Sequence, residues 1–521
     1  AVRNKLIGPN STEIIGAIRR DSFDKDLLFG SATSAFQVEG AAKEGGRGLS
    51  IWDHWTLNQP DKVLDGSNGD VAIDQYHKYK EDVASMKTTG LEAYRFSISW
   101  PRILPGGRIN AGINREGIQY YSDLIDELLA NGIEPYATLF HFDLPNGLEL
   151  EYGGFLSDKI VKDFTEFAEL CFWEFGDRVK NWITFNEGWT YCNSGYVAGT
   201  SPPGHGLSDE EQRNSRYELC GYKGGGTQQI CAQGDAGTEP YLAAHNMILA
   251  HANAVDSYRK LFQENQGGKI GMTNVSHFFE PLHDTDEDRD ACIRALDWML
   301  GWFVAPITTG DYPPNMRKSV KERLPTFSPE ETKLVRGSYD FLGLNYYTTL
   351  YATNTPRLPG EKPTYLSDQE LTTQTERDGV SIGEPEIYKA DLIYITENGM
   401  AEVNDTSLTI SKARVDPLQV RYYNEHLWYL RKAIVEGGVN VKAYFLWAFA
   451  DNFEWGGGYT SRFGIFYVDY KDGRYTRVPK TSAIWWKNFF TKKIKQGSLK
   501  REAKEVVRDY DLRKKPRSNN A

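Results

Sequence analysis

Residues 182–187 read Trp-Ile-Thr-Phe-Asn-Glu, an apolar run that ends in an amide and a carboxylate. Near-continuous apolar runs of this length are typical of strands buried on both faces of a parallel sheet. The pattern recurs along the chain, and amphipathic stretches with helical periodicity, such as 118–130, 160–175 and 243–262, lie between the runs. The other seven runs are 27–30, 93–100, 135–141, 270–275, 341–347, 392–397 and 443–449.

Eight such strands with intervening helices predict an α/β fold, a single (β/α)8 barrel with extended βα loops. The chain has 521 residues, more than most single domains, but barrels of this kind run long as one domain. We expect an N-terminal extension over 1–22, the barrel over 23–490 and a basic C-terminal tail over 491–521.

One interval departs from the pattern. Residues 348–391 join the sixth and seventh strands, yet they carry Pro, Thr, Gly and charge without helical periodicity. Parallel neighbours need a crossover of a dozen or more residues, usually a helix. We therefore expect that residues are missing from the sequence between Gly383 and Ala390; a genuine deletion is the alternative.

Composition limits the partners. A net charge of −11 argues against nucleic acid, and no apolar stretch is long enough to cross a membrane. The nine His show no metal-ligand spacing, so we expect no metal and no cofactor. A small-molecule ligand fits best, and a homo-oligomer stays open.

Five cysteines in so long a chain are not a disulfide framework. Cys220 and Cys231 bracket a Gly-rich run, and they either form a disulfide across one loop or remain free. The other three are expected to be buried thiols.

The tail has its own charge. Residues 491–521 hold eleven Lys/Arg against four Asp/Glu, and 513–517 resembles a short basic nuclear-import signal. Two interpretations stay open: a nuclear or cytoplasmic protein, or a solvated tail on a protein of the endoplasmic reticulum or vacuole.

The strand ends carry the chemistry, because active sites of such barrels lie at the carboxyl ends of the strands. Glu187 and Glu397 end the fourth and seventh strands, which places them across the barrel mouth from each other. One glutamate after an apolar run is usually a surface residue. Two of them, with His141, Asn345 and Trp447 at other strand ends, indicate glycoside hydrolysis, which uses a carboxyl pair.

The sequence also resembles a known family. Residues 184–187 and 395–399 resemble the acid/base and nucleophile motifs of the plant β-glucosidases of glycoside hydrolase family 1. The likeness runs from about 23 to 490 and includes 36–40, 94–100 and 451–455. It implies a retaining β-glucosidase with Glu187 as acid/base and Glu397 as nucleophile.

The resemblance also implies a glucose site. Gln37 and Glu454 would bind the side of the sugar that carries the 3-, 4- and 6-hydroxyls. His141 and Asn186 would bind the 2- and 3-hydroxyls, and the Asn186 bond would strengthen in the transition state. Further sugar contacts would come from Trp447 as the stacking floor, Trp455 and Asn345.

The same resemblance assigns the groups around the carboxyl pair. Tyr347 should donate to Glu397, and Arg95 should help to keep that carboxylate ionised. Glu187 must instead stay protonated near neutral pH, which requires a less polar setting and repulsion from Glu397.

Three positions depart from the family pattern: Gly188 stands where Pro is usual, Phe142 where Trp is usual, and 146–147 is Asn-Gly. All three, together with Trp189, would lie on the aglycone side. The aglycone-facing Trp that the family carries before the seventh strand is also absent.

Residues 174–177, 301–303, 440–442 and 473–475 resemble the branch of strictosidine, raucaffricine and oleuropein glucosidases. We therefore expect a terpenoid-alkaloid or secoiridoid glucoside as substrate. A transglucosidase on the same scaffold is an alternative. A non-catalytic glucoside-binding protein would lack one of the two glutamates, and a plant thioglucosidase would carry Gln at the acid/base position.

Overall fold

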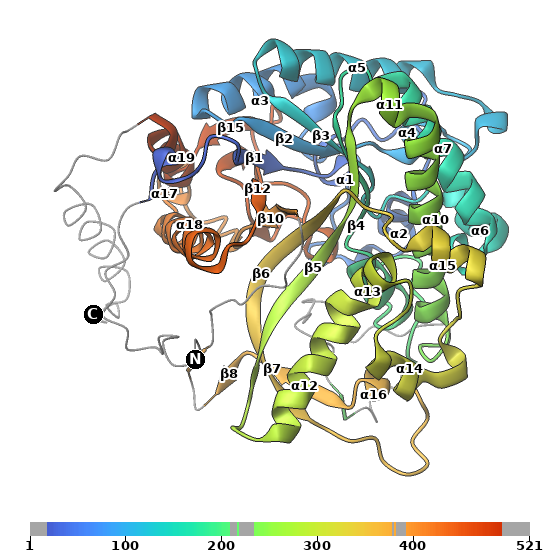
Figure 1. Ribbon diagram of the computed structural model, residues 1–521. Helices are drawn as coiled ribbons and strands as arrows, with labels where there is room; N and C mark the ends of the chain where they lie inside the picture. The colour runs from blue at the N-terminus through green and yellow to red at the C-terminus, as the bar shows by residue number, and fades with distance from the viewer. Residues whose placement is uncertain (1–17, 209–215, 218–233, 378–379, 382–391, 492–521) are drawn as a thin grey trace.

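The computed structural model describes residues 18–208, 216–217, 234–377, 380–381 and 392–491, and Figure 1 shows their arrangement. Eight parallel strands follow the order β10-β12-β1-β2-β3-β4-β5-β6, and β10 also pairs with β6, so the sheet closes into a (β/α)8 barrel. The predicted fold class is confirmed. The strands are β1 (Leu28–Ala32), β2 (Ala93–Ser97), β3 (Glu134–Phe140), β4 (Asn181–Asn186), β5 (Lys269–Pro281), β6 (Phe341–Asn354), β10 (Ile393–Asn398) and β12 (Val441–Trp447).

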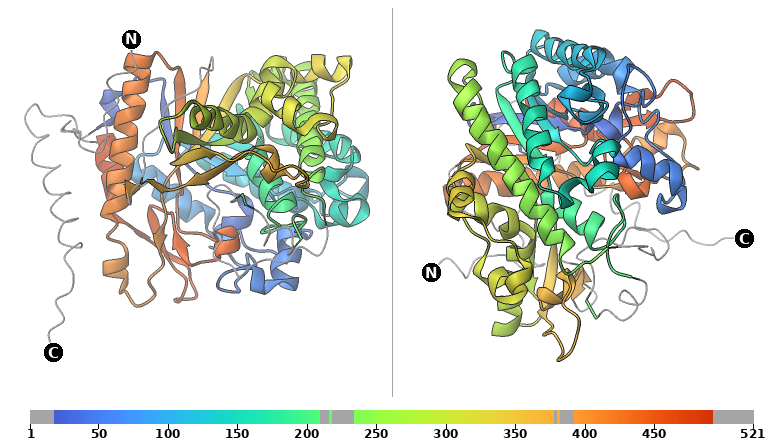
Figure 2. Two further views of the ribbon diagram at one scale, coloured as in Figure 1. Left: turned by 90° about the horizontal axis from the view of Figure 1, so that it is seen from below. Right: turned by 90° about the vertical axis from the view of Figure 1, so that its right-hand side faces the viewer.

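Long helices cover the outside of the barrel (Figures 1 and 2). In α5 (Arg115–Ala130), the buried residues include Ile118, Tyr121, Leu124, Ile125 and Leu128. Their spacing forms one apolar stripe along the helix. This stripe packs on the barrel and leaves the charged face to solvent. The long helices are α3 (Gln75–Thr89), α5 (Arg115–Ala130), α7 (Lys159–Phe175), α10 (Glu239–Ser257), α18 (Pro417–Gly437) and α19 (Thr481–Thr491).

Further helices and short strand pairs form the connections. The helices among them are α1 (Ala35–Val38), α2 (Ile51–Asn58), α4 (Trp100–Ile103), α6 (Asn146–Tyr152), α8 (Gly188–Tyr196), α11 (Gln263–Gln266), α12 (Asp286–Leu296), α13 (Trp302–Thr309), α14 (Pro314–Val320), α15 (Pro329–Val335), α16 (Tyr365–Asp368) and α17 (Ile410–Ala413). Short antiparallel pairs are formed by β8 (Glu376–Arg377) with β9 (Val380–Ser381), β11 (Glu402–Val403) with β13 (Ser461–Arg462), and β14 (Phe466–Asp469) with β15 (Thr476–Pro479).

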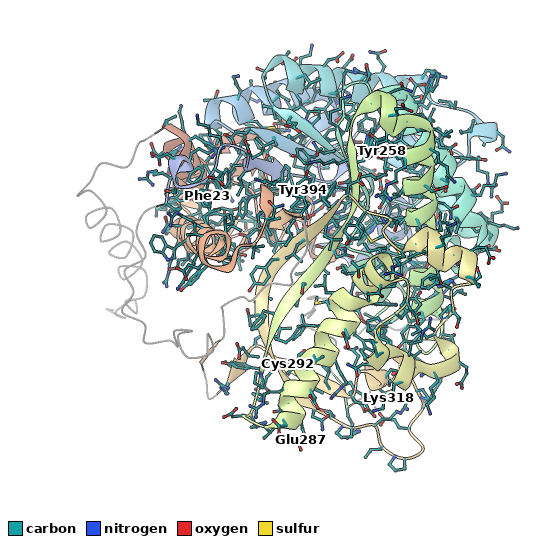
Figure 3. All side chains as sticks on the ribbon, viewed as in Figure 1. Phe23, Tyr258, Glu287, Cys292, Lys318 and Tyr394 are labelled. Carbon is teal, nitrogen blue, oxygen red and sulfur yellow. The ribbon has the colours of Figure 1, made fainter. Side chains whose placement is uncertain are left out.

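The interior of the barrel is packed with side chains. Figure 3 shows Tyr394 inside it, whereas Glu287 and Lys318 point outward from the surface helices. The Tyr394 ring stacks on Phe341 with ring centroids 4.2 Å apart, and Tyr136 meets Phe445 at 4.8 Å. Inward-facing layers of this kind make the barrel a solid core beneath the strand ends.

Two strands run beyond the barrel, which the sequence did not predict. The pairing of β5 with β6 continues from Phe278–Thr349 to Pro281–Ala352, and β7 (Leu371–Gln374) adds antiparallel to β6. The interval 348–391 therefore contains a strand extension, the helix α16 and three short strands. The proposed gap between Gly383 and Ala390 lies outside the described residues.

Residues 18–20 already contact the rest of the fold. Ile18 is buried, its N–H donates to Asn424 Oδ1 at 3.2 Å, and Arg20 pairs with Glu92. Within the described ranges, no helix is both long and apolar enough to cross a bilayer.

The cysteine expectation is confirmed in part. Cys171, Cys192 and Cys292 are buried free thiols. Cys220 and Cys231 lie outside the described residues.

Candidate active site

The structure brings the two predicted glutamates to the carboxyl ends of β4 and β10, two strands at the same end of the barrel that are not neighbours in the sheet. Glu397 lies in β10 beside Asn345 of β6, its partner in the strand register. Glu187 follows directly after β4 and precedes α8. Both side chains are buried.

Glu397 is bound by two strong donors. The Arg95 guanidinium and the Tyr347 hydroxyl each donate to its carboxylate. Arg95 is fully buried in β2 and also donates to Asn186 Oδ1 at 2.6 Å and Thr138 Oγ1 at 3.1 Å. Burial raises the pKa of Glu397 above its usual value, and the Arg95 charge and the Tyr347 hydroxyl offset only part of that rise. The contacts therefore favour its ionised form.

Glu187 has neutral partners instead. Asn345 Nδ2 donates to Oε1 at 2.6 Å, and Thr190 Oγ1 donates to Oε2 at 2.7 Å. Burial, followed by the charge of Glu397, raises the pKa of Glu187 to about 7. The carboxyl group thus retains its proton up to near-neutral pH. Two carboxyls whose environments separate their pKa values are suited to one acid and one base or nucleophile.

Asn345 lies between the two carboxyls. Its amide donates to Glu187 and, at 3.1 Å, to Asn186 Oδ1. Its carbonyl accepts from Thr396 Oγ1 at 2.8 Å, one residue before Glu397. The sequence suggested Asn345 as a sugar contact; the geometry gives it a bridging position.

His141 and Asn186 also lie together. Asn186 Nδ2 is 3.1 Å from His141 Nε2, and because an amide nitrogen can only donate, Nε2 accepts and Nδ1 carries the hydrogen. Burial, and then the Arg95 charge, lowers the pKa of His141, which keeps the ring neutral. Nδ1 is buried and has no hydrogen-bond partner among the described residues, so its N–H is left unpaired.

Aromatic rings surround this histidine. Trp447 and Trp455 stack near it, with centroids 5.9 and 6.0 Å away, and Phe142 meets Trp455 at 5.3 Å. Phe142, Glu187 and Trp455 have positive φ values of 75°, 43° and 49°. Non-glycine residues held in this region are strained, and such strain clusters at functional sites.

A third carboxyl completes the site. Gln37 Nε2 donates to Glu454 Oε2 at 3.3 Å and to Phe453 O at 2.8 Å, and Ser34 fixes the Gln37 carbonyl at 2.6 Å. Burial and the charge of Glu397 raise the pKa of Glu454 to about 8. Glu454 is therefore a hydrogen-bond donor at neutral pH. Among the described residues, no group of three His, Cys, Asp or Glu is arranged to hold a metal.

Two of the residues predicted on the aglycone side, Gly188 and Trp189, are tightly packed, whereas Gly147 is exposed. A Cβ on Gly188 would lie 2.9 Å or less from three atoms of the Phe303 ring, so only glycine fits there without displacing the ring. Trp189 is buried and its indole N–H donates to Tyr365 at 2.8 Å.

Sequence reasoning missed three residues: Thr190, Phe303 and Tyr365. Thr190 had a local signal, since it lies three residues after Glu187 at the start of a helix, where side chains meet. Phe303 and Tyr365 are distant in sequence and had none.

Comparison with known proteins supplies the wider context. The family model described as Glycosyl hydrolase family 1 matches residues 19–495. Oleuropein beta-glucosidase of Olea europaea is 52% identical over 497 residues, 91% of this chain and 90% of its own length. Raucaffricine-O-beta-D-glucosidase of Rauvolfia serpentina is 49% identical over 95% of this chain and 97% of its own length. Among solved structures, a mutant of the rice β-glucosidase Os3BGlu6 in a covalent complex with glucose superimposes with a TM-score of 0.84 at 40% identity, covering 91% of this chain and all of that one.

Proposed function

Because this chain belongs to glycosyl hydrolase family 1 and is a retaining β-glucosidase, we propose that Glu397 is its nucleophile and Glu187 its acid/base, acting on a secoiridoid or terpenoid-alkaloid glucoside. The observation that carries the assignment is the difference in partners. Glu397 contacts a guanidinium and a phenol, whereas Glu187 contacts an amide and an alcohol.

The first half-reaction follows from these contacts. Glu397 attacks the anomeric carbon, the bond to the aglycone oxygen breaks, and Glu187 gives its proton to that oxygen. The product is a glucosyl ester on Glu397 and a free aglycone alcohol. In the ester the negative charge of Glu397 is gone, so one of the causes that raise the pKa of Glu187 is removed.

The second half-reaction uses that fall in pKa. Glu187, now an ionised carboxylate, accepts a proton from water, and the water oxygen attacks the anomeric carbon. Glucose leaves with its β configuration retained, and Glu397 regains its charge beside Arg95. In this cycle the same group serves first as acid and then as base.

The sugar site is proposed from the family resemblance. His141 and Asn186, which contact each other, would bind the 2- and 3-hydroxyls. Gln37 and Glu454 suit the opposite edge of the ring, and Trp447 provides the apolar face. These groups supply donors and a stacking surface, and Gln37, His141, Asn186 and Trp447 are buried, where hydrogen bonds are stronger than in water.

The aglycone class is inferred from similarity. The oleuropein and raucaffricine enzymes match this chain at 52% and 49% identity over at least 90% of their own lengths. A panel that contains oleuropein, raucaffricine, strictosidine and a simple aryl glucoside tests this. The proposal fails if the aryl glucoside has the highest kcat/KM. Added alcohols in the same assay separate hydrolysis from transfer of glucose to an acceptor.

The roles of the glutamates are tested separately. Glu397→Ala should abolish turnover of every substrate, because no glucosyl ester can form. Glu187→Ala should spare glucosides with activated leaving groups, and azide should restore its turnover. Equal loss on activated and unactivated substrates would void the assignment.

A further inference from the structure

The start of helix α8 decides where Glu187 points. Glu187 caps the helix with φ of 43°, and Thr190 of the first turn donates to its carboxyl. Gly188 presses against the Phe303 ring of α13. Any movement of this first turn would therefore move the carboxyl, and its orientation depends on what holds residues 188–190.

The Tyr365 hydroxyl connects this first turn of α8 to two other segments by hydrogen bonds. Trp189 Nε1 donates to the Tyr365 hydroxyl at 2.8 Å, and that hydroxyl lies 3.3 Å from Trp298 O, to which it donates. Trp298 lies in a π-helical turn, Asp297–Gly301, which leads directly into α13. The same wall of the molecule thus contacts both Gly188 and Tyr365, and the ring of Tyr365 is buried against Trp302 with centroids 5.2 Å apart.

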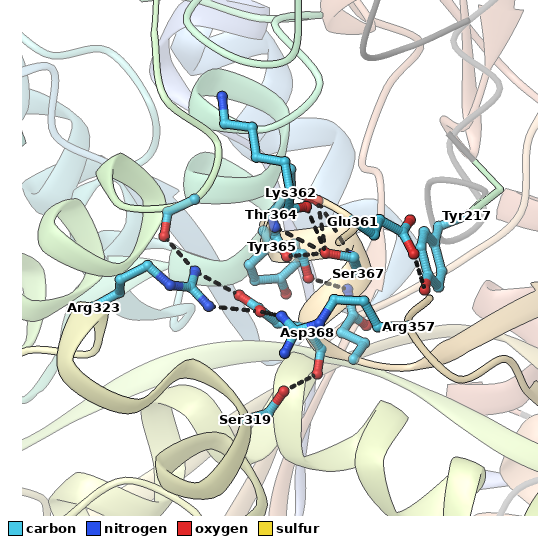
Figure 4. Close-up of polar contacts among 12 residues, drawn as sticks. Tyr217, Ser319, Arg323, Arg357, Glu361, Lys362, Thr364, Tyr365, Ser367 and Asp368 are labelled. Carbon is cyan, nitrogen blue, oxygen red and sulfur yellow. Dashed lines mark hydrogen bonds and ion pairs between the residues drawn. The ribbon is translucent and has the colours of Figure 1, made fainter. Parts of the chain in front are cut away.

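Tyr365 belongs to a helix that cannot hold itself in place. Helix α16 has four residues, far fewer than an isolated helix needs. It is fastened by Asp368, which is fully buried. The Asp368 carboxylate accepts two bonds from Arg323, at 2.7 and 2.8 Å, and one from Arg357 at 3.0 Å (Figure 4). The Tyr241 hydroxyl of α10 donates to the same group at 2.8 Å.

These contacts form a continuous connection. Asp368 joins four segments, α16 carries Tyr365, and Tyr365 contacts the residue two positions after Glu187. A buried, fully bonded carboxylate of this kind is rigid, because every displacement breaks a charge-assisted bond.

We propose that Tyr365 is a positioning residue for Glu187, held in place by Asp368, so that the crossover between β6 and β10 orients the acid/base side chain. The inference rests on the proposed role of Glu187. It assigns a catalytic purpose to α16, none of whose four residues belongs to the sugar site described above.

The test is Tyr365→Phe, which keeps the ring and removes the hydroxyl that bonds to Trp189 and Trp298. General acid catalysis matters only when the leaving group needs a proton. We therefore expect kcat/KM for an alkyl β-glucoside to fall about tenfold, while kcat/KM for dinitrophenyl β-glucoside changes less than about twofold. The tenfold loss is only part of the about 10²–10⁴-fold that proton transfer as a whole contributes, because Glu187 itself remains. Azide should raise the turnover of dinitrophenyl glucoside by Glu187→Ala but not by Tyr365→Phe, which retains its acid/base group.

Tyr121→Phe is the matched control. The Tyr121 hydroxyl is also buried, accepts from Ser99 N at 2.7 Å and donates to Glu39 Oε1. Its loss should reduce stability without changing the ratio of the two substrates.

The outcomes separate the two proposals. If Glu187→Ala loses activity equally on both glucosides, the assignment of Glu187 is wrong. If Glu187→Ala discriminates between them and Tyr365→Phe loses both equally, or neither, the assignment of Glu187 stands and the positioning role of Tyr365 is refuted. Should Tyr365→Phe fold poorly, Arg357→Lys, which weakens the hold on Asp368, should show the same selective loss in milder form.

Discussion

Replacing the acid/base candidate should change the pH dependence of stability as well as that of activity. The pKa of Glu187 is raised from 4.5 to about 7 by burial and by Glu397. Between these two values the folded protein holds a proton that the unfolded chain releases. Stability therefore falls as pH rises through this window.

The size of the effect follows from the width of the window. One pKa unit corresponds to about 1.4 kcal/mol, so a shift of about 2.5 units makes the folded state about 3 kcal/mol less stable at pH 8 than at pH 4.5, as far as this group is concerned. Glu187→Gln has no proton to lose. The free energy of unfolding of the variant minus that of the wild type should therefore increase by about 3 kcal/mol from pH 4.5 to pH 8. The increase should be somewhat smaller where water reaches the site.

Two measurements test this. Urea unfolding of wild type and Glu187→Gln at pH 5, 6, 7 and 8 gives the difference directly, and the fall of kcat/KM with an alkyl glucoside above neutral pH should be absent from the residual activity of the variant. Glu149→Gln is the control, because burial also raises the pKa of Glu149 to about 7 on α6. It should reproduce the stability effect and leave the pH profile of activity unchanged. A difference in free energy of unfolding between wild type and Glu187→Gln that stays the same at every pH would refute the reasoning.

Two more changes have defined outcomes. Tyr347→Phe removes a donor that lowers the pKa of Glu397, so the acid limb of kcat/KM should move to higher pH and kcat should fall by about 10–100-fold; an unmoved acid limb would show that the phenol does not stabilise the carboxylate. Gly188→Ala forces a methyl group into the Phe303 ring and should cost about 1–3 kcal/mol, measured by urea unfolding. Phe303→Leu should recover part of that loss in the double variant, and simple additivity of the two changes would contradict the contact.

The sequence predicted the barrel because its strands are buried on both faces and therefore read as apolar runs. It did not predict how far β5 continues. Residues 276–281 contain His, Glu and Pro, and they are held as a strand only because β6 pairs with them and β7 covers β6 in turn. Long-range pairing of this kind leaves no periodic signal within the strand itself.

The sequence could indicate site residues where a chemically active side chain stands directly at the end of a strand. Glu187 and Glu397 end apolar runs, and strand ends in a closed barrel must converge. The resemblance placed Trp189 on the aglycone side, and the structure adds that its indole is buried and bonded to Tyr365. Whether a side chain faces a ligand or a neighbouring segment depends on residues more than a hundred positions away.

The charge balance of the site explains why the strongest donors gather at one carboxyl. Glu187 and Glu397 are buried at strand ends and Glu454 is half-buried near them, and burial raises the pKa of each. Arg95 contacts Glu397 and can neutralise one charge. With Glu187 and Glu454 protonated below about pH 7 and 8, the site holds one anion beside one cation. Each proton lost above those values leaves an unpaired buried charge, which is costly. The placement of Arg95 therefore selects which of the three carboxyls is ionised, and so which one can act as the nucleophile.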